Sequence, residues 1–349
     1  SSSRTANSFA ASPKRLAAKL FAVLLLLGAV GVLITSVLGY VRAREALREA
    51  IYNQLTITRE SKAHQVANYI RTVRSDLRLL ATSKMVIDAM RGFREAVDEL
   101  DRKPLPDDVR QRVVGWYEGE YMPMVQRLLG PDAPLKDFLP VSPAPYFLQD
   151  WFIVQNPNPK DRRKLLDKAT AAGSYGEVHA VFHPLLRMAA STLNFTDLLL
   201  VDPRTSRVIY TVDKEAEFGT SLRAGPYRKS NLAAAAARCA EAPDPSRTCL
   251  EDFADFLPSD GDPEAFMAAP VIENGVVTGV LVAQMSIDEL DGIVTGERRW
   301  QHEGLGRTGD DYLVGPDNYI RSSPRLFFEN RDRYMAELAG GQTSPEDIE

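Results

Sequence analysis

The most prominent feature of the hydropathy pattern is an uncharged apolar run near the start of the chain. Residues 20–41 form a run of 22 without one charged side chain. At 1.5 Å per residue such a helix is about 33 Å long, which matches a hydrocarbon core of about 30 Å. A cleaved signal peptide is the alternative, but its apolar core normally has about 7–15 residues and ends at a small-x-small site. The run therefore predicts an uncleaved transmembrane helix at residues 20–41.

The charges that flank this run bear on its orientation. Four Lys or Arg residues precede it and five follow within a similar distance, so the positive-inside rule gives a tie. Acidic residues break the tie, because near the run they occur only after it, at Glu45, Glu49 and Glu60. We therefore expect residues 1–19 to be a cytoplasmic tail. Residues 42–349 would then lie outside the cytoplasm, in the periplasm of a cell with two membranes.

Residues 44–100 carry the periodicity of a long helix. From Ala63 to Leu80, apolar residues recur at alternating spacings of three and four, and an apolar face continues to Leu100 after a break near Ser83-Lys84. Two interpretations remain open, and they are compatible. The helix packs on its own domain, or it forms a stalk in a homodimer and carries signals to the membrane.

The remainder of the chain up to residue 303 predicts an antiparallel sheet with helices. Residues 101–160 hold ten prolines between short helices, and residues 161–192 return to a helical pattern. Asn274-Gly275 is a strong signal for a type I′ hairpin. Strands that follow one another as neighbours, with helices before and between them, predict an α+β fold. The expected strands are residues 196–201, 207–212, 251–257, 264–272 and 276–286, and the expected helices are residues 228–238 and 287–300.

A second unit is expected to begin at Gly304. Residues 304–325 have the pattern of a strand, a turn at residues 315–318 and a second strand. The 46 residues from Gly304 onward are too few to bury a stable core by themselves. We therefore expect residues 42–303 to form one lobe and residues 304–349 to be the beginning of a smaller lobe that is cut short.

Charge and cysteine content narrow the function. A net charge of −5 leaves no basic surplus for phosphates, so a nucleic-acid partner is not expected. Cys239 and Cys249 lie ten residues apart across a turn-rich stretch, a spacing that fits neither a redox motif nor a metal site. Outside the cytoplasm a disulfide between them would stabilise the loop by about 2–3 kcal/mol. Two free thiols are the alternative.

The motifs that could carry chemistry do not support an enzyme. Gly304-x-Gly306-x-x-Gly309 matches a dinucleotide fingerprint, but a strand follows it where a helix is needed. His179 and His183 share a helix face, but Ala180 stands where a zinc protease has its glutamate, so buried structural histidines are expected instead of a metal site. The acidic residues are scattered, as on a solvated surface. We expect no cofactor and no metal.

A sheet that faces helices outside a membrane suits the capture of a small molecule. Arg223 would offer a carboxylate two hydrogen bonds, and Tyr210 and Tyr227 would supply an aromatic wall with hydroxyls. The alternative for each residue is a structural or surface role. The candidate ligand-binding residues, which lie at strand ends and in the segment over the sheet, are Tyr210, Asp213, Arg223, Tyr227, Asp255 and Gln284.

Several stretches together resemble a double-Cache sensor domain. They are LTITRESKAHQVANYIRTVRSDLRLLATSKMVIDAMRGF, TDLLLVDPRTSRVIYTVDKEAEFGTSLRAGPY, FMAAPVIENGVVTGVLVAQMSIDEL and GLGRTGDDYLVGPDNYIRSSPR, so the resemblance covers about residues 42–345. It implies the extracytoplasmic, PAS-like sensor of a bacterial transmembrane receptor, with a distal and a smaller proximal lobe. The output module, of the cyclase, histidine kinase or chemoreceptor type, would lie outside this chain.

The ligand motif of the amino-acid-binding members of this family matches only in part. Arg223 and Pro226 match, and Tyr227 stands where the family has Trp, but Gly225 departs from the pattern. Arg228 departs as well, and Gln284 replaces an expected Asp, which would bind the α-ammonium group. The resemblance therefore implies a small-molecule ligand without predicting an amino acid. A membrane-tethered scaffold that binds a periplasmic protein is the alternative function.

Overall fold

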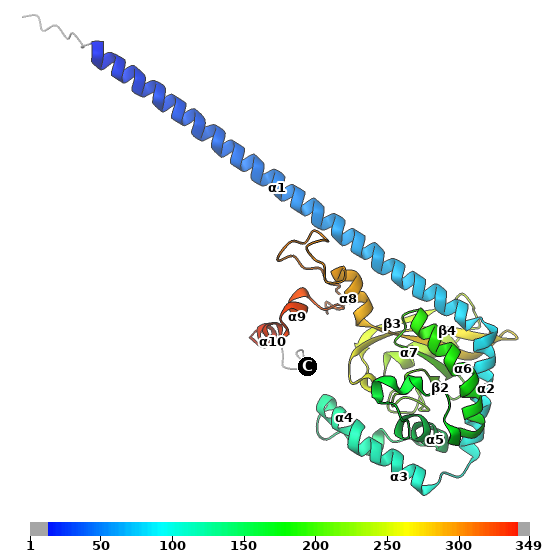
Figure 1. Cartoon of the computed structure of the whole chain (residues 1–349). Coiled ribbons are helices and arrows are strands. Elements are labelled where there is room, and N and C mark those ends of the chain that lie inside the picture. The colour runs from blue at the N-terminus through cyan, green and yellow to red at the C-terminus, as the bar shows by residue number, and fades with distance from the viewer. Residues whose placement is uncertain (1–12, 341–349) are drawn as a thin grey trace, which may run out of the picture. The chain divides into compact units, whose positions relative to one another are not determined.

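The computed structural model describes residues 13–340. The chain consists of two compact units, and the boundary between them in the sequence lies between Ser61 and Lys62. Helix α1 (Pro13–Ala81) contributes to both units. The predicted tail at residues 1–12 and the last residues of the predicted second lobe, 341–349, lie outside the described residues. Within the described part, the element order and the antiparallel sheet confirm the α+β class (Figure 1).

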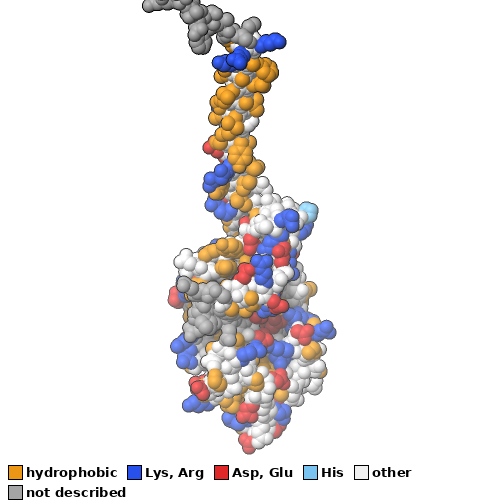
Figure 2. Space-filling model, turned by 90° about the vertical axis from the view of Figure 1, so that its left-hand side faces the viewer, with side chains coloured by type: hydrophobic (Ala, Val, Ile, Leu, Met, Phe, Trp, Pro, Cys, Tyr) orange, Lys and Arg blue, Asp and Glu red, His pale blue; other side chains and the backbone are white. Residues whose placement is uncertain are grey.

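The first unit is the N-terminal part of α1. Apolar side chains cover this part of the helix between two groups of basic side chains (Figure 2), and those of residues 20–41 are exposed throughout. The helix is long and apolar enough to cross a membrane, with a mean hydropathy of 2.7 in its most apolar window. A signal sequence near the N-terminus would pass the same test, so the prediction of an anchor stays a prediction.

The long helical pattern ends and restarts close to the predicted break. Helix α1 ends at Ala81, and Ser83 begins α2 (Lys84–Arg102) by accepting the N–H of Val86 at its hydroxyl, 3.3 Å away. The apolar faces on both sides of the break are buried, including Val73, Leu77 and Leu100. From Val73 onward the stripe therefore packs against its own domain, which is the first of the two interpretations, whereas Ala63 at its start is exposed. The structure contains one chain and leaves the dimer untested.

The second unit is built on a five-stranded antiparallel sheet in the order β2-β1-β5-β4-β3. Asn274 (φ 52°) and Gly275 (φ 76°) join β4 to β5 with both residues in the left-handed region, as the type I′ prediction requires. All five predicted strands are present. They are β1 (Asp197–Asp202), β2 (Arg207–Thr211), β3 (Cys249–Asp255), β4 (Pro263–Glu273) and β5 (Val276–Ser286).

Different helices cover the two faces of this sheet, and alternate strand residues point to opposite faces. Gly279 of β5 lies directly under Met90 of α2, where a Cβ atom would overlap the methionine side chain. The next residue, Val280, shares a hollow on the other face with Ala233 of α7 (Asn231–Ala240). We call these the α2 face and the α7 face. Helix α6 (Gly173–Thr192) packs beside α2.

The region between α2 and β1 is less regular than the sequence predicted. Residues 161–192 were expected to be helical, but α6 begins only at Gly173 (φ 53°). The preceding backbone turns so that the carbonyls of Asp167 and Lys164 accept hydrogen bonds from His179 and His183, at 2.8 and 2.7 Å. The helices here are α3 (Asp107–Trp116), α4 (Met122–Leu129) and α5 (Pro143–Gln149), with π turns at Tyr117–Tyr121 and Asp150–Val154 and 3₁₀ turns at Leu135–Asp137, Lys160–Leu165 and Thr170–Ala172.

The chain after the sheet returns to α1. Lys62 of α1 is 5% exposed, and its ammonium group lies 2.8 Å from the Glu303 carboxylate and 3.0 Å from the carbonyl of Ile293. The two strands predicted after Gly304 are reduced to one isolated antiparallel bridge, between Val314 and Ile320. The last helices are α8 (Ile287–Thr295), α9 (Arg325–Glu329) and α10 (Arg331–Gly340).

Candidate functional site

A group of buried and partly buried acidic side chains lies on the α7 face and in the chain that follows β2. We call it the acidic cluster. Its position follows from the register, in which Gln284 of β5 pairs with Asp197 of β1 and with Phe266 of β4. The sheet therefore places side chains from three strands next to the connection after β2. The members of the acidic cluster are Asp197, Asp213, Glu215, Glu217 and Glu264.

Asp197 is the best satisfied member. One of its oxygens accepts the backbone N–H groups of Leu198 and Val212, both at 2.7 Å, and that of Asp213 at 3.1 Å. The other oxygen accepts the hydroxyl of Thr211. Burial, assisted by the charge of Asp213, raises the pKa of Asp197 to about 7, while these donors oppose the rise. Asp197 therefore fixes the backbone at the end of β2.

Lys214 places an ammonium group inside the same region. The residue is completely buried, and its Nζ donates to the carbonyl of Val212 at 3.2 Å and lies 4.9 Å from the centre of the Tyr210 ring. Burial lowers the pKa of Lys214 to about 7, against the opposing effect of the carboxylates of Asp197 and Asp213. The internal cation is therefore itself close to losing its charge at neutral pH.

Glu217 is the member whose carboxylate has no hydrogen-bond partner among the described residues. It is 1% exposed, and neither carboxylate oxygen has a hydrogen-bond partner among the described residues. Burial raises its pKa well above the usual value, and the charges of Glu215 and Asp197 raise it further. Two residues after Glu217, Gly219 (φ 82°) allows the backbone to approach α5, where a Cβ atom would lie 2.7 Å from Cα of Pro145.

A chain of hydrogen bonds connects the sheet to the outer part of the acidic cluster. Gln284 donates from Nε2 to the hydroxyl of Ser259 at 3.1 Å, and that hydroxyl donates to Glu215 at 2.8 Å. Gln284 also lowers the pKa of Glu264, but burial dominates and raises it to about 8. Burial likewise raises the pKa of Glu215 to about 8. Both acids therefore hold a proton at neutral pH in the structure as it stands.

Tyrosines form the wall next to Glu217. The hydroxyls of Tyr121 and Tyr227 lie 2.7 Å apart and are buried. Burial raises the pKa of Tyr117, Tyr121 and Tyr227, and the charge of Glu217 contributes to each rise. Trp116 stacks on Tyr121 with ring centres 5.6 Å apart. The site therefore combines buried carboxyl groups with the electron-rich faces of aromatic rings, and such faces suit a cation.

Comparison with solved structures returns sensor and ligand-binding domains of receptors. They include the sensor domain of the V. cholerae histidine kinase DctB, at 14% identity and a TM-score of 0.27, covering 52% of this chain and 59% of that one. The ligand-binding domain of the Pseudomonas fluorescens chemoreceptor CtaA in complex with L-serine has 15% identity and a TM-score of 0.28, over 62% and 68%. The ligand-binding domain of the Pseudomonas aeruginosa PAO1 amino acid chemoreceptor PctC in complex with GABA has 14% identity and a TM-score of 0.27, over 62% of this chain and 71% of that one.

All three are sensor or ligand-binding domains by their descriptions, and none is similar enough to show the family of this chain. The chain spans 59% of the length of the DctB domain, and the identities and TM-scores are low, so no ligand, partner or residue role is carried over from them. No family model and no curated protein matches the chain. The site must therefore be interpreted from its own residues.

The structure brings only part of the predicted site together. Tyr227 and Gln284 are buried beside the acidic cluster, and Asp213 belongs to it, with its carboxylate 3.0 Å from Lys164. Tyr210 is buried as well, but its hydroxyl contacts Nδ1 of His183 at 2.7 Å on the α6 side. The other two predicted residues, Arg223 and Asp255, are exposed and lie away from the cluster.

The residues that the sequence did not identify are chiefly the acids. They were expected on a solvated surface, and for this group the structure corrects that expectation, because Asp197, Glu217 and Glu264 are at most 5% exposed. A usable signal was present in Asp213-Lys214-Glu215-Ala216-Glu217, where four charged residues lie between β2 and the buried Phe218. Such a dense charged run inside a core-forming region indicates a functional or structural cluster.

The surroundings of the two helix histidines favour a structural role for them. His179 and His183 are completely buried and stacked with ring centres 4.2 Å apart. Burial lowers the pKa of His183 to about 2, so it stays neutral, with Nε2–H donating to a carbonyl and Nδ1 accepting from Tyr210. Within residues 13–340 no group of three or more His, Cys, Asp or Glu side chains is arranged to hold a metal ion.

The two cysteines are buried free thiols in the structure. Cys239 lies at the end of α7 and donates to the carbonyl of Ala268 at 3.2 Å, and Cys249 begins the adjacent edge strand β3. Burial raises the pKa of Cys239, and a contact with the Cys249 side chain raises it further. The two side chains are therefore neighbours, and the predicted disulfide stays a prediction.

Proposed function

We propose that this chain is the sensory region of a membrane-anchored receptor and that the acidic cluster binds a small organic cation. The observation that carries the proposal is Glu217, a fully buried carboxyl group whose two oxygens have no hydrogen-bond partner among the described residues. Burying an unpaired polar group costs about 1–3 kcal/mol, and more when it is charged. A ligand ammonium group would supply the missing partner.

The remaining members of the site fit such a ligand. Tyr121 and Tyr227 would hold the ammonium or its methyl groups against ring faces, as aromatic cages do. Glu264 and Glu215, which are protonated at neutral pH without a ligand, would release protons when a cation enters. Binding would therefore be coupled to proton release and would strengthen as the pH rises toward 8.

A route into the cluster is marked by two ion pairs near the surface. Lys160 pairs with Asp260 and Lys164 pairs with Asp213, and in both pairs the lysine is about half exposed. Exposed ion pairs contribute only about 0–1 kcal/mol. These two ion pairs would therefore oppose the entry of a ligand only weakly.

The signal would leave through the helices that pack on the sheet. Helix α2 lies on the face opposite the cluster, and α1, which precedes it directly, contains the apolar segment. With residues 20–41 in the membrane and the sheet outside the cytoplasm, a shift of the sheet would be transmitted to the membrane. In a homodimer, the exposed part of α1 would form the contact between subunits.

The test uses choline and putrescine as cations, and 3,3-dimethylbutan-1-ol as the uncharged isostere of choline. The full chain in nanodiscs is melted with each compound. Saturation to 100 times the dissociation constant should stabilise it by about 2.7 kcal/mol, and the uncharged isostere should have no effect. Glu217→Gln should abolish the shift, whereas Glu177→Gln, which removes an exposed charge, should preserve it.

Two results would contradict the proposal. If no cation shifts the melting temperature of the folded chain, the acidic cluster is structural, and the scaffold function that binds a partner protein is favoured. If Glu217→Gln still binds the cation with unchanged affinity, the ligand lies elsewhere. Cysteines introduced between Ala63 and Leu80 test the signalling part separately, because a dimeric stalk gives crosslinks whose pattern changes when the cation is added.

A further inference from the structure

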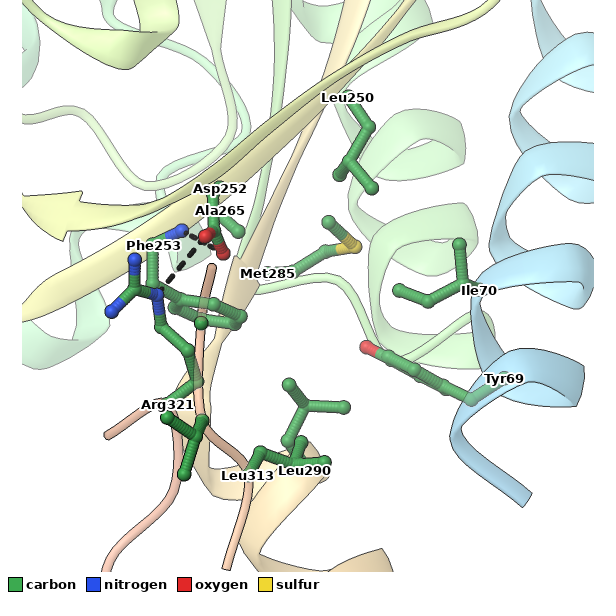
Figure 3. A pocket seen from close by; sticks show the side chains of 12 residues that line it. Tyr69, Ile70, Leu250, Asp252, Phe253, Ala265, Met285, Leu290, Leu313 and Arg321 are labelled. Atoms are coloured by element: carbon green, nitrogen blue, oxygen red, sulfur yellow. Dashed lines mark hydrogen bonds and ion pairs between the residues drawn. The ribbon is translucent and has the colours of Figure 1, made fainter. Parts of the chain in front are cut away.

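A cavity of about 360 Å³ lies on the α2 face of the sheet, near the C-terminal end of α1 within the second unit (Figure 3). This volume is within the range of about 300–1,000 Å³ that small-molecule sites occupy. The cavity is separate from the acidic cluster, because adjacent residues of the same strand face the two sites. Gln284 faces the acidic cluster, and Met285 faces the cavity, where it pairs with Ala265 of β4.

Most of the lining is apolar and comes from elements far apart in the sequence. Helix α1 contributes Tyr69 and Ile70, the sheet contributes Leu250, Phe253, Ala265 and Met285, α8 contributes Leu290, and the segment after Gly304 contributes Leu313, Val314 and Gly315. Arg321 and Asp252 close one side with an ion pair of 3.0 Å. Because that pair is internally satisfied, it leaves the cavity without a free charge from these two groups.

One polar group in this lining has no hydrogen-bond partner in the described part of the chain. The hydroxyl of Tyr69 is buried, makes no hydrogen bond within the described residues, and points into the space between Met285 and Leu290 (Figure 3). Burial, with the charge of Glu289 adding to it, raises the pKa of Tyr69 to about 12. The hydroxyl is therefore a permanent donor at neutral pH, and the nearby Glu289 disfavours an anionic acceptor.

We infer that this cavity is a second binding site, which takes a small, neutral, mostly apolar molecule with one hydrogen-bond acceptor placed against the Tyr69 hydroxyl. The inference does not depend on the cation proposed for the other face. A molecule in this cavity contacts α1 directly, as well as the sheet and the segment after Gly304. Its occupation would therefore change how firmly α1 is held, with no movement of the acidic cluster required.

The test uses cyclohexanone, which combines an apolar ring with a carbonyl acceptor. The full chain, labelled with ¹³C in its methionine methyl groups, is titrated in nanodiscs, and Met285→Leu assigns the Met285 resonance. We expect a saturable shift at Met285 but none at Met90 or Met267, which are buried on the same face outside the cavity. Cyclohexanecarboxylate, the anionic counterpart, should bind much more weakly.

Two variants separate the cavity from its polar group. Tyr69→Phe should weaken cyclohexanone binding about three- to tenfold, which is the effect of one lost hydrogen bond. Leu313→Trp, at the partly exposed edge of the cavity, should fill the space and abolish the Met285 shift. The inference is overturned if Met285 does not respond up to the solubility limit, if Tyr69→Phe binds as tightly as the original chain, or if the carboxylate binds equally well. The first and third results need neither Tyr69→Phe nor Leu313→Trp, so they decide the matter even if Leu313→Trp fails to fold.

Discussion

Replacing Glu264 with Gln should make the protein more stable at alkaline pH and leave it almost unchanged at acidic pH. Glu264 is 5% exposed, and one of its carboxylate oxygens has no hydrogen-bond partner within the described residues. Burial, with the nearby charges of Asp262 and Asp213 adding to it, raises its pKa from the usual 4.5 to about 8. The folded state therefore keeps a proton that the unfolded chain has released between these two pH values.

The size and sign of the effect follow from this proton. Because the folded state binds more protons, the free energy of unfolding falls as the pH rises from about 4.5 to about 8. At about 1.4 kcal/mol for each pH unit, this one group accounts for a loss of at most about 5 kcal/mol across the window. Gln keeps the shape and the hydrogen-bonding capacity but has no proton to lose, so the variant should not show this loss.

Urea unfolding of the full chain in nanodiscs, repeated between pH 4.5 and 8.5, measures the difference directly. The gap between Glu264→Gln and the original chain should be near zero at pH 4.5 and grow to several kcal/mol at pH 8. Asp255→Asn removes one negative charge from an exposed position on the neighbouring strand and should change stability little at any pH. A gap that does not depend on pH, or a variant less stable at pH 8, would refute the reasoning.

Two further predictions concern the backbone after β2 and the cysteines. Gly219→Ala should reduce the free energy of unfolding by more than about 2 kcal/mol, because φ is 82° and the added Cβ would press on α5. Urea unfolding would detect this loss, and an unchanged midpoint would show that the turn can relax. Cys239 and Cys249 should form a disulfide when the chain is exported to an oxidising compartment, and mass spectrometry would detect it as the loss of two hydrogens. Reduction of this disulfide should lower the free energy of unfolding by about 2–3 kcal/mol. Two thiols that can be alkylated in the exported, unfolded chain would contradict the prediction.

The sheet was predictable from the sequence, because its signals are local. Asn274-Gly275 specifies a hairpin through backbone conformation alone, and apolar runs on both sides supply the strands. The break at Ser83 was also predictable, since a capping serine and a shift in the apolar face occur together. These features depend on residues within a few positions of one another.

The acidic cluster was not predictable in the same way. Residues such as Glu217 and Glu264 lie 47 positions apart by number and are buried only because the sheet and the chain after β2 enclose them. Hydropathy treats each as a surface residue, since isolated charges are almost never fully buried. The cavity beside Tyr69 was missed for a related reason, because its walls come from five separate elements and from the segment after Gly304.

The contact of Lys62 with Glu303 restricts the ways in which α1 can move. The Lys62 side chain is buried, and besides its ion pair with the partly exposed Glu303 it donates to the carbonyl of Ile293 near the end of α8, so separating it from both groups would leave a buried charge without a partner. Sliding or rotation of α1 at this level must therefore displace residues 293–303 as well, unless the pair first separates. A stimulus that moved α1 would thus reorient the beginning of the segment after Gly304 in the same step. The helix and this segment would therefore move together.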